Sequence, residues 1–229
     1  MTFELSTKFR FAIFDVAGTT VLDEGIVIES FLDALDVVEP RSTKVEQYLQ
    51  VIQATMGERK IDVFLKIFGE LNKAEQAHEA FVKSYLARVK RGEVLAIPGS
   101  EALFSKLRNQ AVKIGLNTGF SRNILDAIIE SLGWQTLVDY SVASSEVNLG
   151  RPAPDMILSL VERYRRDVGH HLVGSEIVVF GDTIADIESA KRAGIDARVA
   201  IHSGVHTVDE LTEAGASVVI SSVADVVVK

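Results

Sequence analysis

Short runs of apolar residues alternate along this chain with stretches in which apolar residues recur every three or four positions. The first run, at residues 11–14, stops at Asp15 and is followed by Gly18. Runs of this length, bounded by polar residues and glycine, predict buried strands. Similar runs occupy residues 112–116, 140–143, 177–180, 197–201 and 218–220. Strands that alternate with helical patterns predict an α/β fold with a doubly wound parallel sheet covered on both faces.

The helical stretches between these runs carry recognisable end signals. Ser100 is expected to cap one helix, and Thr207 with Glu210 forms a capping box for another. Gly194 suits the end of a third helix, because glycine readily takes the left-handed conformation found there. Helices are therefore expected over residues 101–108, 122–132, 155–167 and 184–193, and after Thr207.

Residues 26–90 break the alternation, because they hold helical patterns only. Apolar residues recur there in three groups: Val45, Tyr48, Leu49, Ile52 and Met56; Ile61, Phe64, Leu65 and Phe68; Ala74, Ala77, Phe81 and Tyr85. This pattern predicts a small all-helical cap inserted after the first strand. We expect a core domain of residues 1–22 and 97–229 and a cap domain of residues 23–96.

Polar residues follow three of the expected strands, at Asp15, at Asn117 and Thr118, and at Asp182. Ligands of doubly wound sheets bind beyond the carboxyl ends of the strands. A helical insertion after the first strand would cover that same edge. The pattern therefore predicts an active site between core and cap.

Composition narrows the classes of function. The 229 residues include no cysteine, which excludes disulfides, thiolate metal sites and cysteine nucleophiles. The net charge of −8 argues against nucleic-acid binding but permits a small anionic ligand. No apolar run reaches the roughly 18 residues that cross a bilayer, and no secretory signal is evident. We expect a cytoplasmic protein without membrane partners, and the apolar cap helices are compatible with a homodimer.

Three carboxylates form the first candidate site. Asp15 stands where a strand meets a glycine-containing loop, and Asp182 ends another strand. Asp186 follows four residues later in the first turn of a helix, so it can face the same point as Asp182. A turn or a helix cap would explain each acid alone. Together they predict a site for Mg²⁺, which binds a few carboxylates, water and phosphate.

Two further segments supply groups for an anion. Thr118, before Gly119, offers a hydroxyl donor at a strand end, where a turn is the simpler explanation. Arg151 lies on a loop with two prolines and offers a cation to phosphate or to Asp15. A lone loop arginine is more often a solvated charge.

These segments, in this order, resemble the four sequence motifs of the haloacid dehalogenase superfamily of hydrolases. The resemblance covers nearly the whole chain, including the helical cap, and implies a Rossmann-like core. It implies that Asp15 attacks phosphorus and binds Mg²⁺. The Ala17 carbonyl and Asp182 would complete the protein ligands, and Asp186 would support the metal site. Each of these roles is carried over from a matching motif position.

The resemblance also implies the phosphate contacts. Thr118 would bind phosphate, and Arg151 would take the basic position of the third motif. Substrate contacts are expected from Ala17, Gly18 and Gly119. The chain departs from the usual pattern at Ala17, where most members have a second aspartate that protonates the leaving group.

The form Asp-x-Ala-Gly-Thr resembles the phosphonoacetaldehyde hydrolase (phosphonatase) family, which also has arginine in its third motif. That family carries a cap lysine that forms a Schiff base with the substrate aldehyde. Here the segment from Met56 to Lys60 resembles that lysine motif, with Met56 as a substrate contact. A surface lysine is the simpler explanation of Lys60. Val63 occupies the position of the family's proton-moving histidine. Lys60 in combination with Ala17 and Arg151 nevertheless favours the Schiff base.

The chemistry of these residues is consistent. Direct cleavage of a carbon–phosphorus bond leaves a carbanion, whereas a protonated imine on Lys60 accepts the electrons. A lysine with a pKa near ~10.4 must be partly neutral to attack a carbonyl, and burial or the neighbouring Arg59 is expected to lower that pKa. The expected function is therefore Mg²⁺-dependent hydrolysis of phosphonoacetaldehyde or a related 2-oxo-phosphonate through an aspartyl phosphate.

Two alternatives stay open. One is a phosphatase or phosphomutase acting on small esters such as phosphoglycolate, and the other is a catalytically silent phosphate-binding protein. His202 and His206 are spaced like a metal pair, but Gly204 between them favours a loop. Trp134 is expected to pack in the core or at its rim.

Overall fold

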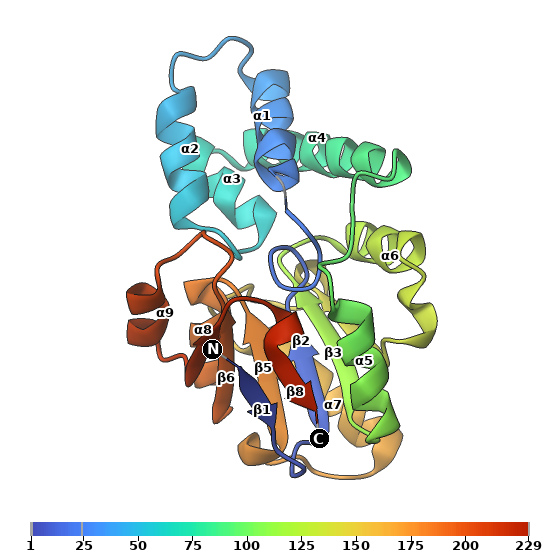
Figure 1. The fold of residues 1–229 in the computed structure, drawn as a ribbon. Helices are drawn as coiled ribbons and strands as arrows, with labels where there is room; N and C mark the ends of the chain where they lie inside the picture. Colours follow the sequence, from blue (N-terminus) through green and yellow to red (C-terminus); the bar gives the residue numbers. More distant parts are fainter. Residues whose placement is uncertain (1, 24, 229) are drawn as a thin grey trace.

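The computed structural model describes residues 2–23 and 25–228 and confirms the predicted α/β architecture. Six parallel strands of the described chain form one sheet in the order β4-β3-β2-β5-β6-β7. Figure 1 shows this sheet below a separate group of helices. The strands are β2 (Phe11–Phe14), β3 (Lys113–Thr118), β4 (Tyr140–Ala143), β5 (Ile177–Gly181), β6 (Ala197–Ile201) and β7 (Val218–Ile220).

The central strand β2 explains why its apolar run is unbroken. It pairs with β3 on one side and β5 on the other, and all four of its residues are buried. Phe11 and Ile13 pack on one face of the sheet, whereas Ala12 and Phe14 pack on the opposite face. A parallel strand with both faces covered requires apolar side chains at every position.

Helices cover both faces of the sheet. The face of Phe14 packs against α5 (Ser100–Asn109) and α6 (Arg122–Ser131), and the face of Phe11 packs against α7 (Asp155–Val168) and α8 (Ile184–Arg192). The short α9 (Val208–Ala214) packs near β7. Trp134 begins the 3-10 turn η1 (Trp134–Thr136), is fully buried, and donates its indole N–H to Glu101 at 3.1 Å. The other 3-10 turns are η2 (Ser144–Glu146), η3 (Gly174–Glu176) and η4 (Val223–Asp225).

Local details correct two expectations and add a sheet that was not expected. A second, two-stranded sheet pairs β1 (Phe3–Leu5) with β8 (Val226–Val228), and the sequence pattern did not predict it. Ser100 is not an N-cap: Gly99 holds that position, and the Ser100 hydroxyl donates instead to the carbonyl of Thr20 at 3.1 Å. Met56 lies beyond its expected helix, because α2 ends at Ala54.

The cap consists of α1 (Ile26–Val38), α2 (Val45–Ala54), α3 (Lys60–Phe68) and α4 (Leu71–Lys90). Its centre is aromatic: the Phe31 ring lies 5.0 Å from the Phe64 ring and 4.9 Å from the Phe81 ring. The two connections to the core run side by side, since the Leu22 N–H donates to the Leu95 carbonyl at 2.9 Å. The cap helices therefore stand together above the carboxyl end of the sheet (Figure 1).

Two further observations bear on the earlier expectations. His202 and His206 lie in the loop between β6 and α9, as expected, and α9 begins after the capping box of Thr207 and Glu210. Within the part of the chain that the structure describes, no helix combines the length and apolar character needed to cross a membrane.

Candidate active site

A small cavity lies between the cap and the carboxyl ends of the sheet strands. It encloses about 80 Å³, well below the roughly 300–1,000 Å³ of sites for drug-sized ligands. Its volume therefore favours a substrate of few atoms. All four motif segments and the cap lysine reach it, and its lining includes Asp15, Ala17, Gly18, Asp23, Met56, Gly57, Lys60, Thr118, Gly119, Phe120, Arg151, Asp182, Thr183 and Ser203.

Asp15, Asp182 and Asp186 come together as their positions predicted. Each is buried, and one oxygen atom of each lies within 4.8 Å of the others. Asp15 directly follows β2, Asp182 directly follows β5, and Asp186 lies in the first turn of α8. The second oxygen of Asp186 accepts hydrogen bonds from the N–H and the hydroxyl of Thr183, which fixes the acid at the start of its helix.

Two hydroxyls orient Asp182. Thr19 donates to Oδ1 at 3.1 Å, and Ser203 donates to Oδ2 at 2.8 Å. The loop after Asp15 approaches Asp182 so closely that a Cβ atom on Gly18 would lie 2.3 Å from Asp182 Oδ2. Gly18 also has a φ of 85°, which favours glycine. This position therefore excludes a larger residue.

The crowding of carboxylates changes their acidity. Burial raises the pKa of Asp15 to about 7; the Asp186 carboxylate adds to that rise, and Arg151 opposes it. Burial and the charges of Asp15 and Asp186 raise the pKa of Asp182 well above its ordinary value. Three buried carboxylates beside one guanidinium leave an excess of negative charge, and their oxygen donors are those that Mg²⁺ prefers. The donor set therefore fits a divalent cation.

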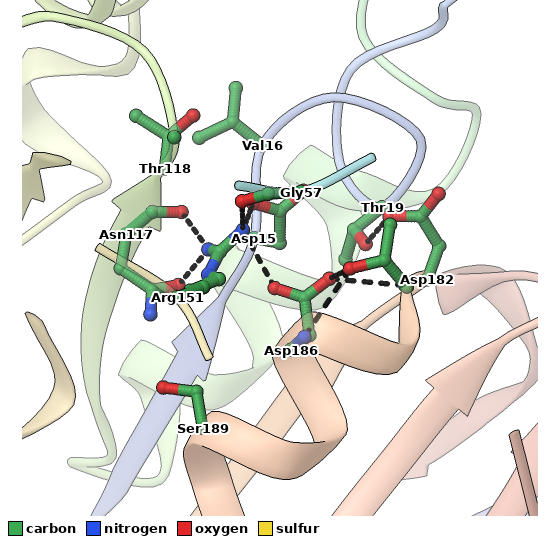
Figure 2. Close-up of polar contacts among 12 residues, drawn as sticks. Asp15, Val16, Thr19, Gly57, Asn117, Thr118, Arg151, Asp182, Asp186 and Ser189 are labelled. Carbon is green, nitrogen blue, oxygen red and sulfur yellow. Dashed lines mark hydrogen bonds and ion pairs between the residues drawn. The ribbon is translucent and has the colours of Figure 1, made fainter. Parts of the chain in front are cut away.

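Arg151 is buried and not a solvated charge. Its Nη1 lies 2.7 Å from Oδ1 of Asp15 and 2.7 Å from Oδ1 of Asp186. Its Nη2 donates to the carbonyl and to the side-chain oxygen of Asn117, both at 2.9 Å. Figure 2 shows this guanidinium between the end of β3 and the acidic cluster. Its Nε is buried and has no hydrogen-bond partner among the described residues.

Thr118 and Gly119 form the β3 side of the cavity. The Thr118 hydroxyl oxygen accepts the N–H of Phe120 at 3.3 Å, which leaves its own proton for a ligand. The cap lies directly on Gly119: a Cβ atom there would be 2.4 Å from the carbonyl oxygen of Glu58. The Gly57 carbonyl also accepts from Arg151 Nη1 at 3.5 Å. Cap and core are thus in contact around the cavity.

Lys60 is a buried residue of the cavity, which is inconsistent with a surface lysine. It is 5% exposed, and its Nζ lies 5.7 Å from the Phe31 ring centre and 5.5 Å from that of Phe120. The ammonium donates to the Glu58 carbonyl at 3.3 Å. Burial lowers the pKa of Lys60 to about 8, because the charged form loses hydration; Asp15 opposes this shift.

The cation that also lowers the pKa of Lys60 is Arg151, not the expected Arg59. Arg59 forms an ion pair with Asp62 at 2.8 Å and donates to the Asn148 carbonyl at 3.2 Å. It therefore connects the cap to the core. Val63 is buried within α3 and is not among the residues that line the cavity.

Sequence reasoning missed three residues of this site. Asp23 lines the cavity from the connection to the cap, Ser203 holds Asp182, and Asn117 holds Arg151. Asn117 precedes Thr118 in the same segment, and Ser203 follows the end of β6, so position at the sheet edge was the available signal. Asp23 carried no such signal.

Comparison with known proteins agrees with this geometry. The haloacid dehalogenase-like hydrolase family matches residues 12–200. A phosphonoacetaldehyde hydrolase of Bacillus cereus is 26% identical over 201 residues, which cover 82% of this chain and 74% of that protein. A probable phosphatase, IndB, of Dickeya dadantii is 27% identical over 222 residues, which cover 94% and 90% of the two chains.

One solved structure extends the comparison to three dimensions. The phosphonoacetaldehyde hydrolase-like protein of Oleispira antarctica superposes with a TM-score of 0.75 at 24% identity. The match covers 95% of this chain and 90% of that one. At this identity the likeness supports the fold alone.

Proposed function

Since this chain belongs to the haloacid dehalogenase-like hydrolase family, we propose that it hydrolyses the carbon–phosphorus bond of phosphonoacetaldehyde or a related small 2-oxo-phosphonate. One observation carries the proposal. A buried lysine with its pKa lowered to about 8 lines the same cavity as the Asp15 carboxylate. Such an amine is partly neutral near physiological pH and can attack a carbonyl.

The first half of the reaction takes place at Lys60. Its neutral amine adds to the aldehyde carbon, and loss of water gives a protonated imine. The rings of Phe31 and Phe120 beside Nζ keep this group out of bulk water. The positively charged imine can then accept the electron pair that is released when the bond between phosphorus and its carbon breaks.

The second half takes place at Asp15. Its carboxylate oxygen attacks phosphorus, the carbon–phosphorus bond breaks, and the bonding electrons move into the imine to give an enamine. Water then releases phosphate from the aspartyl group, and protonation and hydrolysis of the enamine release acetaldehyde and restore Lys60. Thr118, through its hydroxyl proton, and Arg151 would hold phosphoryl oxygens.

The acidic cluster would hold Mg²⁺ through Asp15 and Asp182, with the carbonyl of Ala17 as a further ligand and Asp186 in support. A bound Mg²⁺ would offset the negative charge of the phosphoryl oxygens and of the attacking carboxylate. Arg151 meanwhile holds Asp15 in place and opposes the rise of its pKa.

A magnesium-dependent screen of phosphonoacetaldehyde and phosphoglycolate against wild type and Lys60→Ala tests the proposal. We expect acetaldehyde and phosphate from the phosphonate with wild type, and loss of that turnover by at least about 10³-fold in Lys60→Ala. Borohydride should trap the adduct on Lys60. Full turnover by Lys60→Ala would exclude the imine mechanism.

A small-ester phosphatase is the second candidate. The probable phosphatase of Dickeya dadantii covers more of this chain than the phosphonoacetaldehyde hydrolase does, and the cavity volume suits phosphoglycolate equally. Fast, Lys60-independent release of phosphate from phosphoglycolate, with no action on the phosphonate, would identify that activity.

A further inference from the structure

The proposed imine chemistry requires a proton donor beside Lys60. When the amine has added to an aldehyde, the oxygen of the resulting carbinolamine leaves as water only after it takes up a proton. A general acid for this step must line the cavity next to Nζ and must hold an exchangeable proton. The question is which side chain around Lys60 meets both conditions.

The neighbours of Lys60 leave few candidates. Among the described residues, the charges that most affect the pKa of Lys60 are those of Asp15, Arg151, Asp23 and Glu58. Asp15 and Arg151 are paired with each other at 2.7 Å, and Arg151 does not release a proton. Glu58 presents its carbonyl to Nζ, while its carboxylate pairs with Lys66 at 2.5 Å.

Asp23 is the remaining acid of this group. It lines the active-site cavity together with Lys60, and it also lines an adjoining cavity of about 300 Å³. Gly18 and Ser203 line both spaces as well, so the two cavities adjoin at Asp23. The second cavity carries the polar side chains of His202 and Ser221 and offers a route for proton exchange with solvent.

The Asp23 carboxyl group is also held in place. Its Oδ1 accepts the N–H of Val27 at 3.0 Å, at the start of α1. The residue lies on the connection from core to cap, whereas Lys60 lies at the start of α3. Two elements of the cap therefore bring an acid and an amine to one cavity.

The surroundings of Asp23 make its carboxyl group a weaker acid than an exposed aspartate. Burial raises the pKa of Asp23, and the charge of Lys60 opposes that rise. From α4, Tyr85 also faces this region: burial and the charges of Asp23 and Asp15 raise the pKa of the Tyr85 phenol, so it stays neutral. When Lys60 is neutral, the cation that favours ionised Asp23 is lost, and the acid form gains.

We propose that Asp23 is the general acid that protonates the departing oxygen while Lys60 forms its imine, an inference that rests on the proposed function. The amine nitrogen forms a bond to the aldehyde carbon, and the carbonyl electron pair moves to oxygen, which takes the amine proton. Asp23 then gives its proton to that hydroxyl. The carbon–oxygen bond breaks with its electrons on the departing water, and the nitrogen lone pair forms the double bond of the protonated imine. Asp23 is left as a carboxylate, ready to accept a proton from the water that later hydrolyses the imine.

His78 is the competing donor, because its pKa is lowered by burial and it feels the charge of Lys60. It belongs to a different space, since it lines a surface cavity with Ser121 and Asn123. His78→Gln is therefore a matched control for Asp23→Asn. The asparagine side-chain oxygen can still accept from Val27 N–H, so Asp23→Asn keeps the contact that starts α1.

The test measures adduct formation directly. Wild type, Asp23→Asn, Asp23→Ala and His78→Gln are mixed with phosphonoacetaldehyde, quenched with borohydride at set times, and analysed by mass spectrometry for the adduct on Lys60. Binding of inorganic phosphate and thermal unfolding are measured in parallel. We expect Asp23→Asn to slow adduct formation by about 10²-fold or more, with phosphate affinity and melting temperature near wild type. Formate should partly restore the rate of Asp23→Ala, and His78→Gln should match wild type.

The outcomes separate the two claims. Absence of any adduct in wild type overturns the proposed function and this inference with it. A wild-type adduct that forms equally fast in Asp23→Asn overturns only the inference. Loss of rate in His78→Gln instead, or a slow Asp23→Ala that formate does not restore, also overturns it. Should Asp23→Asn fail to fold, the formate response of Asp23→Ala decides in its place, and restoration there supports the role of Asp23.

Discussion

Nη1 of Arg151 lies 2.7 Å from Oδ1 of Asp15, and both side chains are almost completely buried. The same nitrogen contacts Asp186 at the same distance. The guanidinium lies between two buried carboxylates and compensates their negative charges, which would otherwise be buried without a partner. This contact therefore links the stability of the fold to the geometry of the proposed nucleophile.

Removal of this guanidinium should destabilise the protein. We expect Arg151→Ala to lower the free energy of unfolding by roughly 3–5 kcal/mol without Mg²⁺, because it leaves buried carboxylates unpaired. Urea denaturation with a chelator present measures the change. Arg192→Ala removes an exposed ion pair, with Glu188 one helical turn away, and should cost no more than about 1 kcal/mol. Equal effects of the two substitutions would contradict the role given to Arg151.

The titration of Lys60 predicts a pH dependence of activity. Its pKa of about 8 means that the reactive neutral fraction falls roughly tenfold for each pH unit below that value. In Asp23→Asn, where the proposed general acid no longer titrates, the rate of borohydride-trapped adduct formation should therefore rise with pH and level off above about 8. A rate that is flat from pH 6 to 8 would show that Lys60 deprotonation does not limit the reaction.

The burial of Lys60 should also lower the free energy of unfolding of the protein. Its pKa falls from 10.5 unfolded to about 8 folded, so between these values the unfolded chain binds more protons, and stability rises with pH. Below pH 8 the full cost applies, about 3 kcal/mol from the pKa difference. Lys60→Met should thus raise the free energy of unfolding at pH 7 by roughly 1–3 kcal/mol and abolish activity. Denaturant unfolding at pH 7 and pH 10 checks both the gain and its decrease at high pH.

The hydroxyl of Ser203 should set the affinity of the acidic cluster for Mg²⁺. It donates to Asp182 at 2.8 Å, and loss of a hydrogen bond that orients a metal ligand typically weakens binding about 10–100-fold. We expect a shift of this size in the Mg²⁺ titration of Ser203→Ala. Ser221→Ala changes a serine of the adjoining cavity and should leave the titration unchanged.

Ala17 should decide between carbon–phosphorus and ester cleavage. It lines the cavity at the position where an aspartate would protonate an alkoxide leaving group. We expect Ala17→Asp to raise phosphoglycolate hydrolysis by at least about tenfold, as part of the 10²–10⁴-fold worth of general acid catalysis. Ala17→Asn has similar volume without the acid and should show no gain. A gain in both variants would indicate a change of shape and not of proton transfer.

The sheet could be predicted because its strands are buried on both faces and are therefore apolar throughout. The strands β1 and β8 escaped prediction because they form a separate two-stranded sheet and are only partly buried, so that β1 includes the exposed Glu4 and has no continuous apolar run. Ser100 was misjudged because its hydroxyl has a tertiary partner, the Thr20 carbonyl, that local capping rules do not see.

The acidic cluster could be predicted because position at a strand end fixes where a side chain lies in a parallel sheet. The burial of Lys60 could not, since it depends on how the cap docks beside Phe31 and Phe120. Asp23 was missed for the same reason: its neighbours come from α3 and α4, which are distant in the sequence.

The two chain connections that pair at Leu22 and Leu95 join the cap to the core. One of the two reactive groups lies on each side of these connections. The Lys60 amine belongs to the cap and the Asp15 carboxylate, the proposed nucleophile, belongs to the core, so neither part alone holds both groups of the proposed reaction. The contact of Glu58 with Gly119 is what brings them to one cavity. Opening of the cap would therefore inactivate the enzyme, because it would separate the Lys60 amine from the Asp15 carboxylate without changing either group.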